Sequence, residues 1–178
     1  MAGFTLAEAT LVTAILAVAA GVALPSAAPL AEVRLDAAAS EVVAALRFAR
    51  DDAMRTGQYR MVSCSPDANR IRVFRLEVYS TFTYESFNTL NHPVTGQPYT
   101  VFVGAATPGG PVSLNRCTFT FPDGMASAVT FDPNGNPVRG TGDTASQAQA
   151  LASGTVVVSA GRVSRAVNVE PTGRVTAS

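Results

Sequence analysis

The stretch Gly3-Phe4-Thr5-Leu6-Ala7-Glu8 opens an apolar segment that continues to Leu24 and decides the fold of the chain. Between Ala9 and Ala31 there is no charged residue. These roughly 23 residues are enough to cross a bilayer as a helix, which needs about 20. Glu8 lies at the front edge of the segment, and no Lys or Arg occurs before Arg34. Because an isolated carboxylate in hydrocarbon costs about 2.5–3.5 kcal/mol, we expect Glu8 to have a cationic partner, either an amino terminus or a group on another molecule.

An ordinary secretory signal is the alternative interpretation of this segment. Such a signal begins with a positively charged region and ends at a cleavage site of small residues. The chain has no basic residue at its start, although Ala23 and Ala28 offer candidate small residues. A simple membrane anchor explains the apolar run but not the carboxylate of Glu8.

The helical pattern continues beyond the apolar segment. It predicts a helix from about Phe4 to Thr56, bent or interrupted near Pro25 and Pro29, because an interior proline removes a hydrogen bond and clashes with the preceding turn. Gly57 is a typical stop after a helix. The second half of the helix carries an apolar stripe at helical spacing, formed by Leu35, Ala38, Val42, Ala45, Leu46, Ala49 and Ala53.

From Gln58 onward the pattern changes to short alternating runs separated by turn residues, which is typical of antiparallel β-structure. The apolar stripe of the helix needs a partner, so the predicted fold class is α+β, with a long N-terminal helix packed on a C-terminal antiparallel β domain. Residues 79–97 are predicted to form an irregular loop or short strands, residues 139–153 a flexible loop, and the end of the chain to fray. The expected strands are Tyr59–Ser65, Arg70–Tyr79, Tyr99–Gly104, Cys117–Phe121, Ala128–Asp132, Thr155–Ala160 and Val163–Val169.

The motif G-F-T-L-x-E followed by an apolar helix resembles the class III signal of type IV pilins and pseudopilins. The resemblance implies that a prepilin peptidase cuts between Gly3 and Phe4 and that Phe4, the new terminus, is N-methylated. It also implies that Glu8 pairs with the N-terminal amine of a neighbouring subunit during filament assembly. The chain would then comprise a leader (1–3), a transmembrane and filament-core half of the helix (4–29), an amphipathic half (30–57) and a globular β domain (58–178).

Three further motifs extend the resemblance over nearly the whole chain. Residues 49–58 follow A-R-x-x-A-x-R-x-G-Q, residues 131–135 are F-D-P-N-G, and residues 157–163 are V-V-S-A-G-R-V. Together they are similar to the minor pseudopilin H of type II secretion and the minor pilins FimT and FimU, the GspH/FimT group. This resemblance implies a structural subunit of a type II secretion pseudopilus or a type IV pilus. It would be held in the inner membrane by a single pass, with its β domain outside the cytoplasm, and its partners would be prepilin peptidase and other pilin subunits.

The chain has two cysteines, Cys64 and Cys117. A domain outside the cytoplasm is in an oxidising compartment, where disulfides persist. We expect a disulfide that closes a loop of about 54 residues. The alternative is two separate buried thiols, because free cysteine behaves as a small core hydrophobe.

No pattern of catalytic residues occurs in the sequence. The single histidine, His92, has no nucleophile motif around it, and there is no Gly-rich phosphate loop. One histidine and two distant cysteines do not make a set of metal ligands. The acidic pair Asp51 and Asp52 is interpreted as a solvated part of the helix surface. We therefore expect neither an enzyme nor a bound cofactor or metal.

DNA binding is the second functional hypothesis. Some FimT-like minor pilins bind DNA for uptake in natural transformation through a C-terminal G-R-x-R loop, which Gly161-Arg162-Val163-Ser164-Arg165 resembles with one residue more. The formal net charge of zero is no strong electrostatic footprint for nucleic acid. DNA phosphates would be contacted if three arginines converged at one end of the sheet; otherwise these side chains lie in water. The three are Arg162, Arg165 and Arg174.

Overall fold

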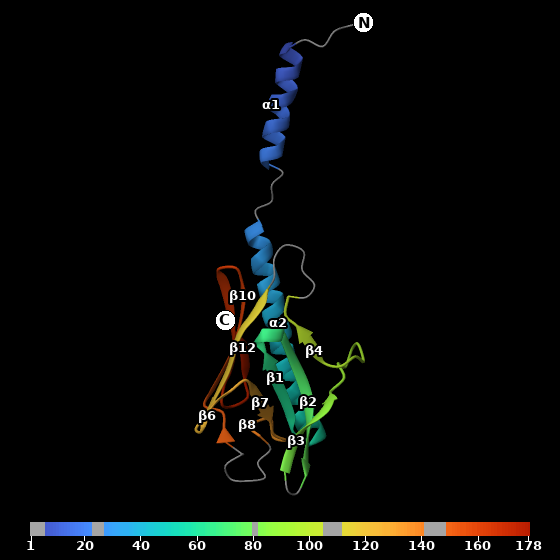
Figure 1. The fold of residues 1–178 in the computed structure, drawn as a ribbon, viewed down its shortest axis with the longest axis vertical. Coiled ribbons are helices and arrows are strands. Elements are labelled where there is room, and N and C mark those ends of the chain that lie inside the picture. Colours follow the sequence, from blue (N-terminus) through green and yellow to red (C-terminus); the bar gives the residue numbers. More distant parts are fainter. Residues whose placement is uncertain (1–5, 23–26, 80–81, 105–111, 141–148) are drawn as a thin grey trace.

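A computed structural model of the chain describes residues 6–22, 27–79, 82–104, 112–140 and 149–178. It contains two helices, α1 (Leu6–Val22) and α2 (Ala27–Thr56), followed by strands and a single 3-10 turn, η1 (Pro66–Ala68). Figure 1 shows α2 lying along the β domain and α1 lying beyond one end of it. The strands are β1 (Arg60–Ser65), β2 (Arg70–Tyr79), β3 (Phe82–Thr89), β4 (Thr100–Phe102), β5 (Ser113–Phe121), β6 (Gly124–Ala126), β7 (Ala128–Phe131), β8 (Pro137–Arg139), β9 (Gln149–Ala150), β10 (Ser153–Ala160), β11 (Val163–Val169) and β12 (Val175–Ala177).

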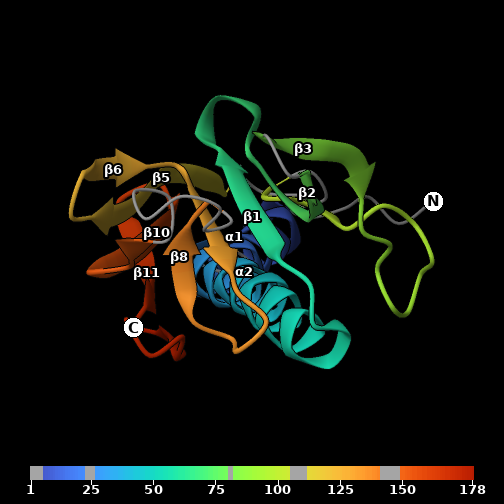
Figure 2. The ribbon, with the colours of Figure 1, turned by 90° about the horizontal axis from the view of Figure 1, so that it is seen from below.

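The described strands form two antiparallel sheets. The first sheet has the order β3-β2-β1-β7-β8-β9, with β4 also paired to β2. The second has the order β12-β11-β10-β5-β6. Seen from below, the strands of both sheets lie around α2 (Figure 2). The α+β class and the packing of the helix on antiparallel strands are therefore confirmed.

The core lies between α2 and the two sheets. All seven residues of the predicted stripe are buried, and Ala39 and Val43 widen it. Five of these nine side chains are alanines, so the helix approaches the strands closely. The first sheet contributes Val62 and Val73 among others, and the second contributes Phe119 and Val156.

The ends of α2 follow from its sequence. Pro29 is the third residue of α2, a place in the first turn where its missing N–H and fixed φ are tolerated. Pro29 therefore does not interrupt the helix, and the break predicted at Pro25 falls outside the described residues. Gly57, at φ +66°, ends the helix as predicted, with its N–H donating to the carbonyl of Ala53 at 2.9 Å. In the described part of the chain, neither helix combines the length and the apolar character needed to cross a membrane.

The structure contains more β-structure than the sequence predicts. The region predicted to form an irregular loop or short strands contains β3, which pairs with β2, and the region predicted to be a flexible loop includes β9, at the edge of the first sheet. The end of the chain is not frayed, because β12 pairs with β11 and Val175 is buried. These strands are short or rich in polar residues, so their formation depends on a neighbouring strand rather than on an alternating pattern.

Candidate assembly site

The predicted assembly residue, Glu8, lies in the first turn of α1. A carboxylate is stabilised there by the partial positive charge of the helix N-terminus. The side chain is exposed, as are all the residues from 6 to 16. Gly3 and Phe4, the predicted cleavage and methylation residues, lie outside the described residues. The exposed large apolar side chains of α1 are Leu6, Leu11, Val12, Ile15 and Leu16.

The two threonines of α1 donate their hydroxyl hydrogen bonds within the helix. The Thr10 hydroxyl donates to the carbonyl of Ala7 at 2.9 Å, and the Thr13 hydroxyl donates to the carbonyls of Ala9 and Thr10 at 2.9 and 3.0 Å. These bonds leave neither hydroxyl in need of water as an acceptor. This part of α1 is therefore suited to an apolar environment.

Two arginines of α2 hold the C-terminal turns of the chain. The Arg50 Nε–H donates to the carbonyl of Gly135 at 3.2 Å, and the Arg47 guanidinium donates to the carbonyl of Val175 at 2.8 Å. The turn that contains Gly135 is closed by Asp132, whose carboxylate accepts the N–H groups of Asn134 and Asn136. The A-R and F-D-P-N-G motifs, which are about 80 residues apart in the sequence, thus meet through a hydrogen bond.

The sequence predicts that Asp51 and Asp52 are both solvated, and for Asp52 this prediction is wrong. Asp51 is exposed, but Asp52 is only 6% exposed and pairs with Arg60, which is 1% exposed, and with Arg55. Burial by itself raises the pKa of the Asp52 carboxyl, but hydrogen bonds from both arginines and their charges outweigh burial and hold the pKa below its ordinary value. The remaining Arg60 donors bond to Thr56, Tyr59 and Gln58. This cluster fixes the connection between α2 and β1.

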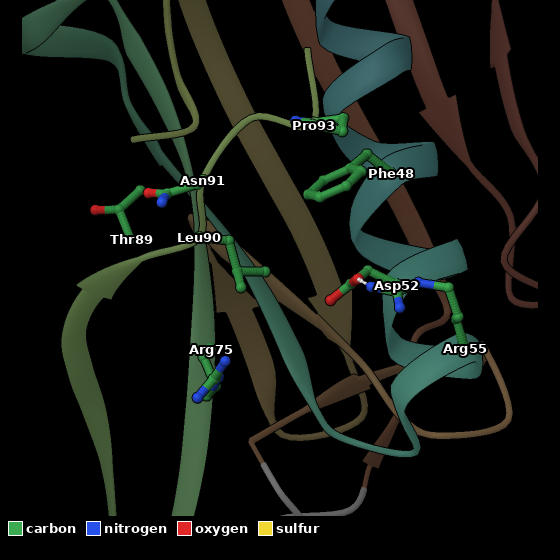
Figure 3. Close-up of a pocket in the computed structure, with 8 residues that line it drawn as sticks. All are labelled: Phe48, Asp52, Arg55, Arg75, Thr89, Leu90, Asn91 and Pro93. Carbon is green, nitrogen blue, oxygen red and sulfur yellow. Dashed lines mark hydrogen bonds and ion pairs between the residues drawn. The ribbon is translucent and has the colours of Figure 1, made fainter. Parts of the chain in front are cut away.

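A cavity of about 630 Å³ adjoins the ion pair (Figure 3). One side of the cavity is formed by three residues of α2, namely Phe48, Asp52 and Arg55. The residues around Leu90 lie opposite, and Arg75 of β2 lies below. Beside it, Tyr99 stacks on Phe48 with ring centroids 4.8 Å apart. The cavity holds no pairing of a nucleophile with a base, and the described residues contain no group of three or more His, Cys, Asp or Glu side chains that could bind a metal ion.

His92 has a structural role in the loop that precedes β4. Its Nδ1 accepts the N–H groups of Val94 and Thr95 at 3.2 and 3.4 Å, and its ring packs against Tyr99. The ring therefore serves to close the turn.

The structure does not bring the three candidate DNA-contacting arginines together, and DNA binding itself stays a prediction. Arg162 lies in the turn before β11, whereas Arg174 follows β11 and precedes β12. A seven-residue strand separates the two turns by roughly 20 Å or more. Arg165 faces α2 instead, with its Nε 2.7 Å from a carboxylate oxygen of Asp36.

The two cysteines lie close together in the core. Cys64 belongs to β1 and Cys117 to β5, both are buried, and both are present as thiols. A hydrogen bond with the Cys117 side chain, together with burial, raises the pKa of Cys64 well above its ordinary value. Sequence alone did not establish this proximity, and the disulfide itself remains a prediction.

One known protein family matches most of the chain. The family described as Type II transport protein GspH matches residues 38–173, which include the whole set of β-strands except β12. The chain belongs to the GspH family. This finding confirms the resemblance to minor pseudopilins and minor pilins, whose subunits take part in type II secretion or type IV pili.

One solved structure, the minor pseudopilin EpsH, shares the fold of this GspH-family chain. The minor pseudopilin EpsH from the type 2 secretion system of Vibrio cholerae is 11% identical, with a TM-score of 0.51, and the match covers 82% of this chain and 96% of EpsH. The type IV minor pilin FimU of Pseudomonas aeruginosa is 15% identical, with a TM-score of 0.48, and the match covers 83% of this chain and 90% of FimU. A comparison with curated proteins found no match.

Proposed function

We propose that the protein is a minor pseudopilin, a structural subunit rather than an enzyme, which is cleaved by prepilin peptidase and assembled into or at the tip of a type II secretion pseudopilus. The observation that carries this proposal is the different burial of apolar side chains on the two helices. The apolar stripe of α2 is buried by the β domain, whereas the large apolar side chains of α1 within residues 6–16 are exposed, and α1 lies beyond that domain. An uncovered apolar helix surface beside a folded domain marks an interaction site for a partner outside its own chain.

In this proposal, Glu8 selects and aligns the partner. Cleavage after Gly3 would create a new amine on Phe4, and the amine of one subunit would lie against the Glu8 carboxylate of the next. Each charge alone is costly in an apolar surrounding, and the pair offsets much of that cost. The internal hydrogen bonds of Thr10 and Thr13 support an apolar surrounding for α1.

Storage in the inner membrane before assembly is part of the proposal. Its support is the sequence, in which no charge occurs between Ala9 and Ala31. Because that run is long enough for a bilayer, the precursor would keep α1 in the lipid and the β domain outside the cytoplasm. A type IV pilus subunit is the related alternative, and we favour the pseudopilus because the matching family is described as a type II transport protein.

The test replaces Glu8 with alanine in the full chain and follows the protein in its own cells. We expect Glu8→Ala to reach the membrane fraction and to be processed, but to be missing from sheared or cross-linked filaments. Glu32→Ala, at an exposed acid of α2, is the matched control and should be incorporated normally. Normal incorporation of the Glu8 variant would refute the assembly role.

A second variant tests the cleavage site. Gly3→Leu places a large side chain directly before the predicted cut, so prepilin peptidase should not cleave the chain and the protein should remain at precursor size. Edman sequencing of the wild-type protein should begin at a methylated Phe4. A mature-sized Gly3→Leu protein would refute the cut, and loss of pili without loss of secretion in a deletion strain would favour the pilus over the pseudopilus.

A further inference from the structure

The two sheets of the β domain are joined by core packing and by a few loop hydrogen bonds. No strand of the first sheet pairs with a strand of the second in the part of the chain that the structure describes. One of the loop bonds is made at Cys64, whose N–H donates to the carbonyl of Ser127 at 3.0 Å. Ser127 lies between β6 of the second sheet and β7 of the first. Cys64 is therefore located where the two sheets meet.

Cys117 approaches the same place from the second sheet. It lies on β5 opposite Val156 of β10, and β5 also contacts β1. Cys64 is 4% exposed and Cys117 is 8% exposed, and both belong to one apolar core. The two strands that carry them are in contact, and the neighbouring Cys117 side chain is the largest cause of the raised pKa of Cys64. Two buried thiols on contacting strands of separate sheets are candidates for a disulfide, whose Cα atoms lie within about 7 Å of each other.

We propose that Cys64 and Cys117 form a disulfide bond that joins the two sheets of the mature protein. The inference rests on the proposed function for its oxidising compartment, because disulfides do not persist in the cytoplasm. Each thiol loses one proton and one electron as the sulfur–sulfur bond forms. A disulfide of an oxidising partner protein or of oxidised glutathione accepts them and is reduced to two thiols.

The bond would form before the two sheets have packed. Thiolates, not thiols, attack disulfides, and burial with a hydrogen bond keeps the folded Cys64 protonated. Neither side chain is open to an oxidising partner once the core has closed. We therefore expect oxidation to be fast for the unfolded chain and slow for the folded, reduced protein.

The first test determines the state of the thiols in full-length protein purified from its own cells in detergent. Free thiols are blocked with an alkylating reagent during lysis, and peptides are then mapped without reduction. We expect a linked pair of peptides that contain Cys64 and Cys117 and no alkylated thiol. Two alkylated cysteines in exported protein would overturn the proposal.

A second test does not depend on export. Purified protein is reduced, unfolded and refolded with oxidised glutathione, and the products are separated by mass. An intrachain disulfide supports the proposed geometry, whereas stable mixed disulfides on both cysteines would overturn it. If the protein were retained in the cytoplasm, the proposed function would be refuted. The refolding test would then still determine whether Cys64 and Cys117 lie close enough to form a disulfide.

Thermal unfolding provides the matched controls. A disulfide that closes about 54 residues should raise Tm by roughly 10 °C, and reductant should remove that gain. Without reductant, Cys64→Ala and Cys117→Ala should each lose the whole gain, so the double variant should differ little from either. With reductant, the coupling between the two substitutions should fall to the small value expected of adjacent thiols; the same coupling with and without reductant would overturn the proposal.

Discussion

The buried ion pair between Asp52 and Arg60 offers a direct test of how α2 is attached to the sheet. Arg60 is 1% exposed, and its Nε lies 2.5 Å from a carboxylate oxygen of Asp52. Asp52→Asn keeps the volume of the side chain and removes its charge. The Arg60 guanidinium would then remain buried without a counter-charge. Removing one partner of a buried ion pair lowers the free energy of unfolding by about 3–5 kcal/mol.

We expect the effect to lie near the lower end of that range. Arg60 retains three other acceptors, on Thr56, Tyr59 and Gln58, so it is not left without hydrogen bonds. A loss of about 3 kcal/mol corresponds to a decrease in Tm of roughly 6–12 °C for a chain of this length. The second partner, Arg55, is 74% exposed and adds little, because surface ion pairs contribute about 0–1 kcal/mol.

The assay is thermal unfolding of the full-length protein in detergent, followed by near-ultraviolet circular dichroism at pH 7. Asp51→Asn is the matched control, because Asp51 is the adjacent residue on the same helix and is exposed. Its effect should stay within about 0.5 kcal/mol. If the two variants unfold within about 1 kcal/mol of each other, the buried pair does not stabilise the protein as argued.

The remaining predictions address pH, a close backbone approach and DNA. The folded pKa of Asp52 is below the ordinary 3.8, so its contribution to the free energy of unfolding is complete above that value and is lost as pH falls through the lower folded pKa. The stabilities of the wild type and Asp52→Asn, measured against pH, should therefore converge in acid. A difference that stays constant with pH would contradict this. Gly173→Ala should lower the free energy of unfolding by about 2 kcal/mol more than Gly161→Ala. Both glycines have positive φ, but a Cβ at Gly173 would lie 2.5 Å from a backbone oxygen, whereas a Cβ at Gly161 would meet open space. Equal losses of stability in urea unfolding would disprove the clash. In an electrophoretic shift with duplex DNA at physiological salt, the wild-type protein and a triple alanine variant should behave alike, and a shift lost only in the variant would restore the DNA hypothesis. The three replaced residues are Arg162, Arg165 and Arg174.

Much of the architecture could be read from periodic patterns. The stripe of α2 was predicted residue by residue, because a helix that packs on a sheet repeats its apolar positions every three or four residues. The hairpin of β1 and β2 was also predicted, because alternating runs flank a clear turn. Strands β6, β8, β9 and β12 were not predicted, and β3 lies in a region predicted to form an irregular loop or short strands. All five are defined by pairing with a neighbour and carry little periodic signal of their own.

The site residues divide in the same way. Glu8 could be singled out from sequence, because a carboxylate at the edge of an apolar segment is unusual wherever it folds. The burial of Asp52 could not, because it depends on Arg60 approaching from the next element. Nor could the separation of Arg162 from Arg174, because which end of a strand a turn occupies is set by the topology of the whole sheet.

The contact between Arg47 and Val175 has a consequence for biogenesis. A nascent chain emerges from its N-terminus, so α2 is complete long before β12 has been synthesised. Yet Arg47 bonds to the carbonyl of Val175, and the N–H of Ser178 donates to the carbonyl of Ala166 at 2.9 Å. Because β10, β11 and β12 all contact α2, part of its alanine-rich face would stay uncovered until these strands have been synthesised. A holdase that shields this face would act in that interval.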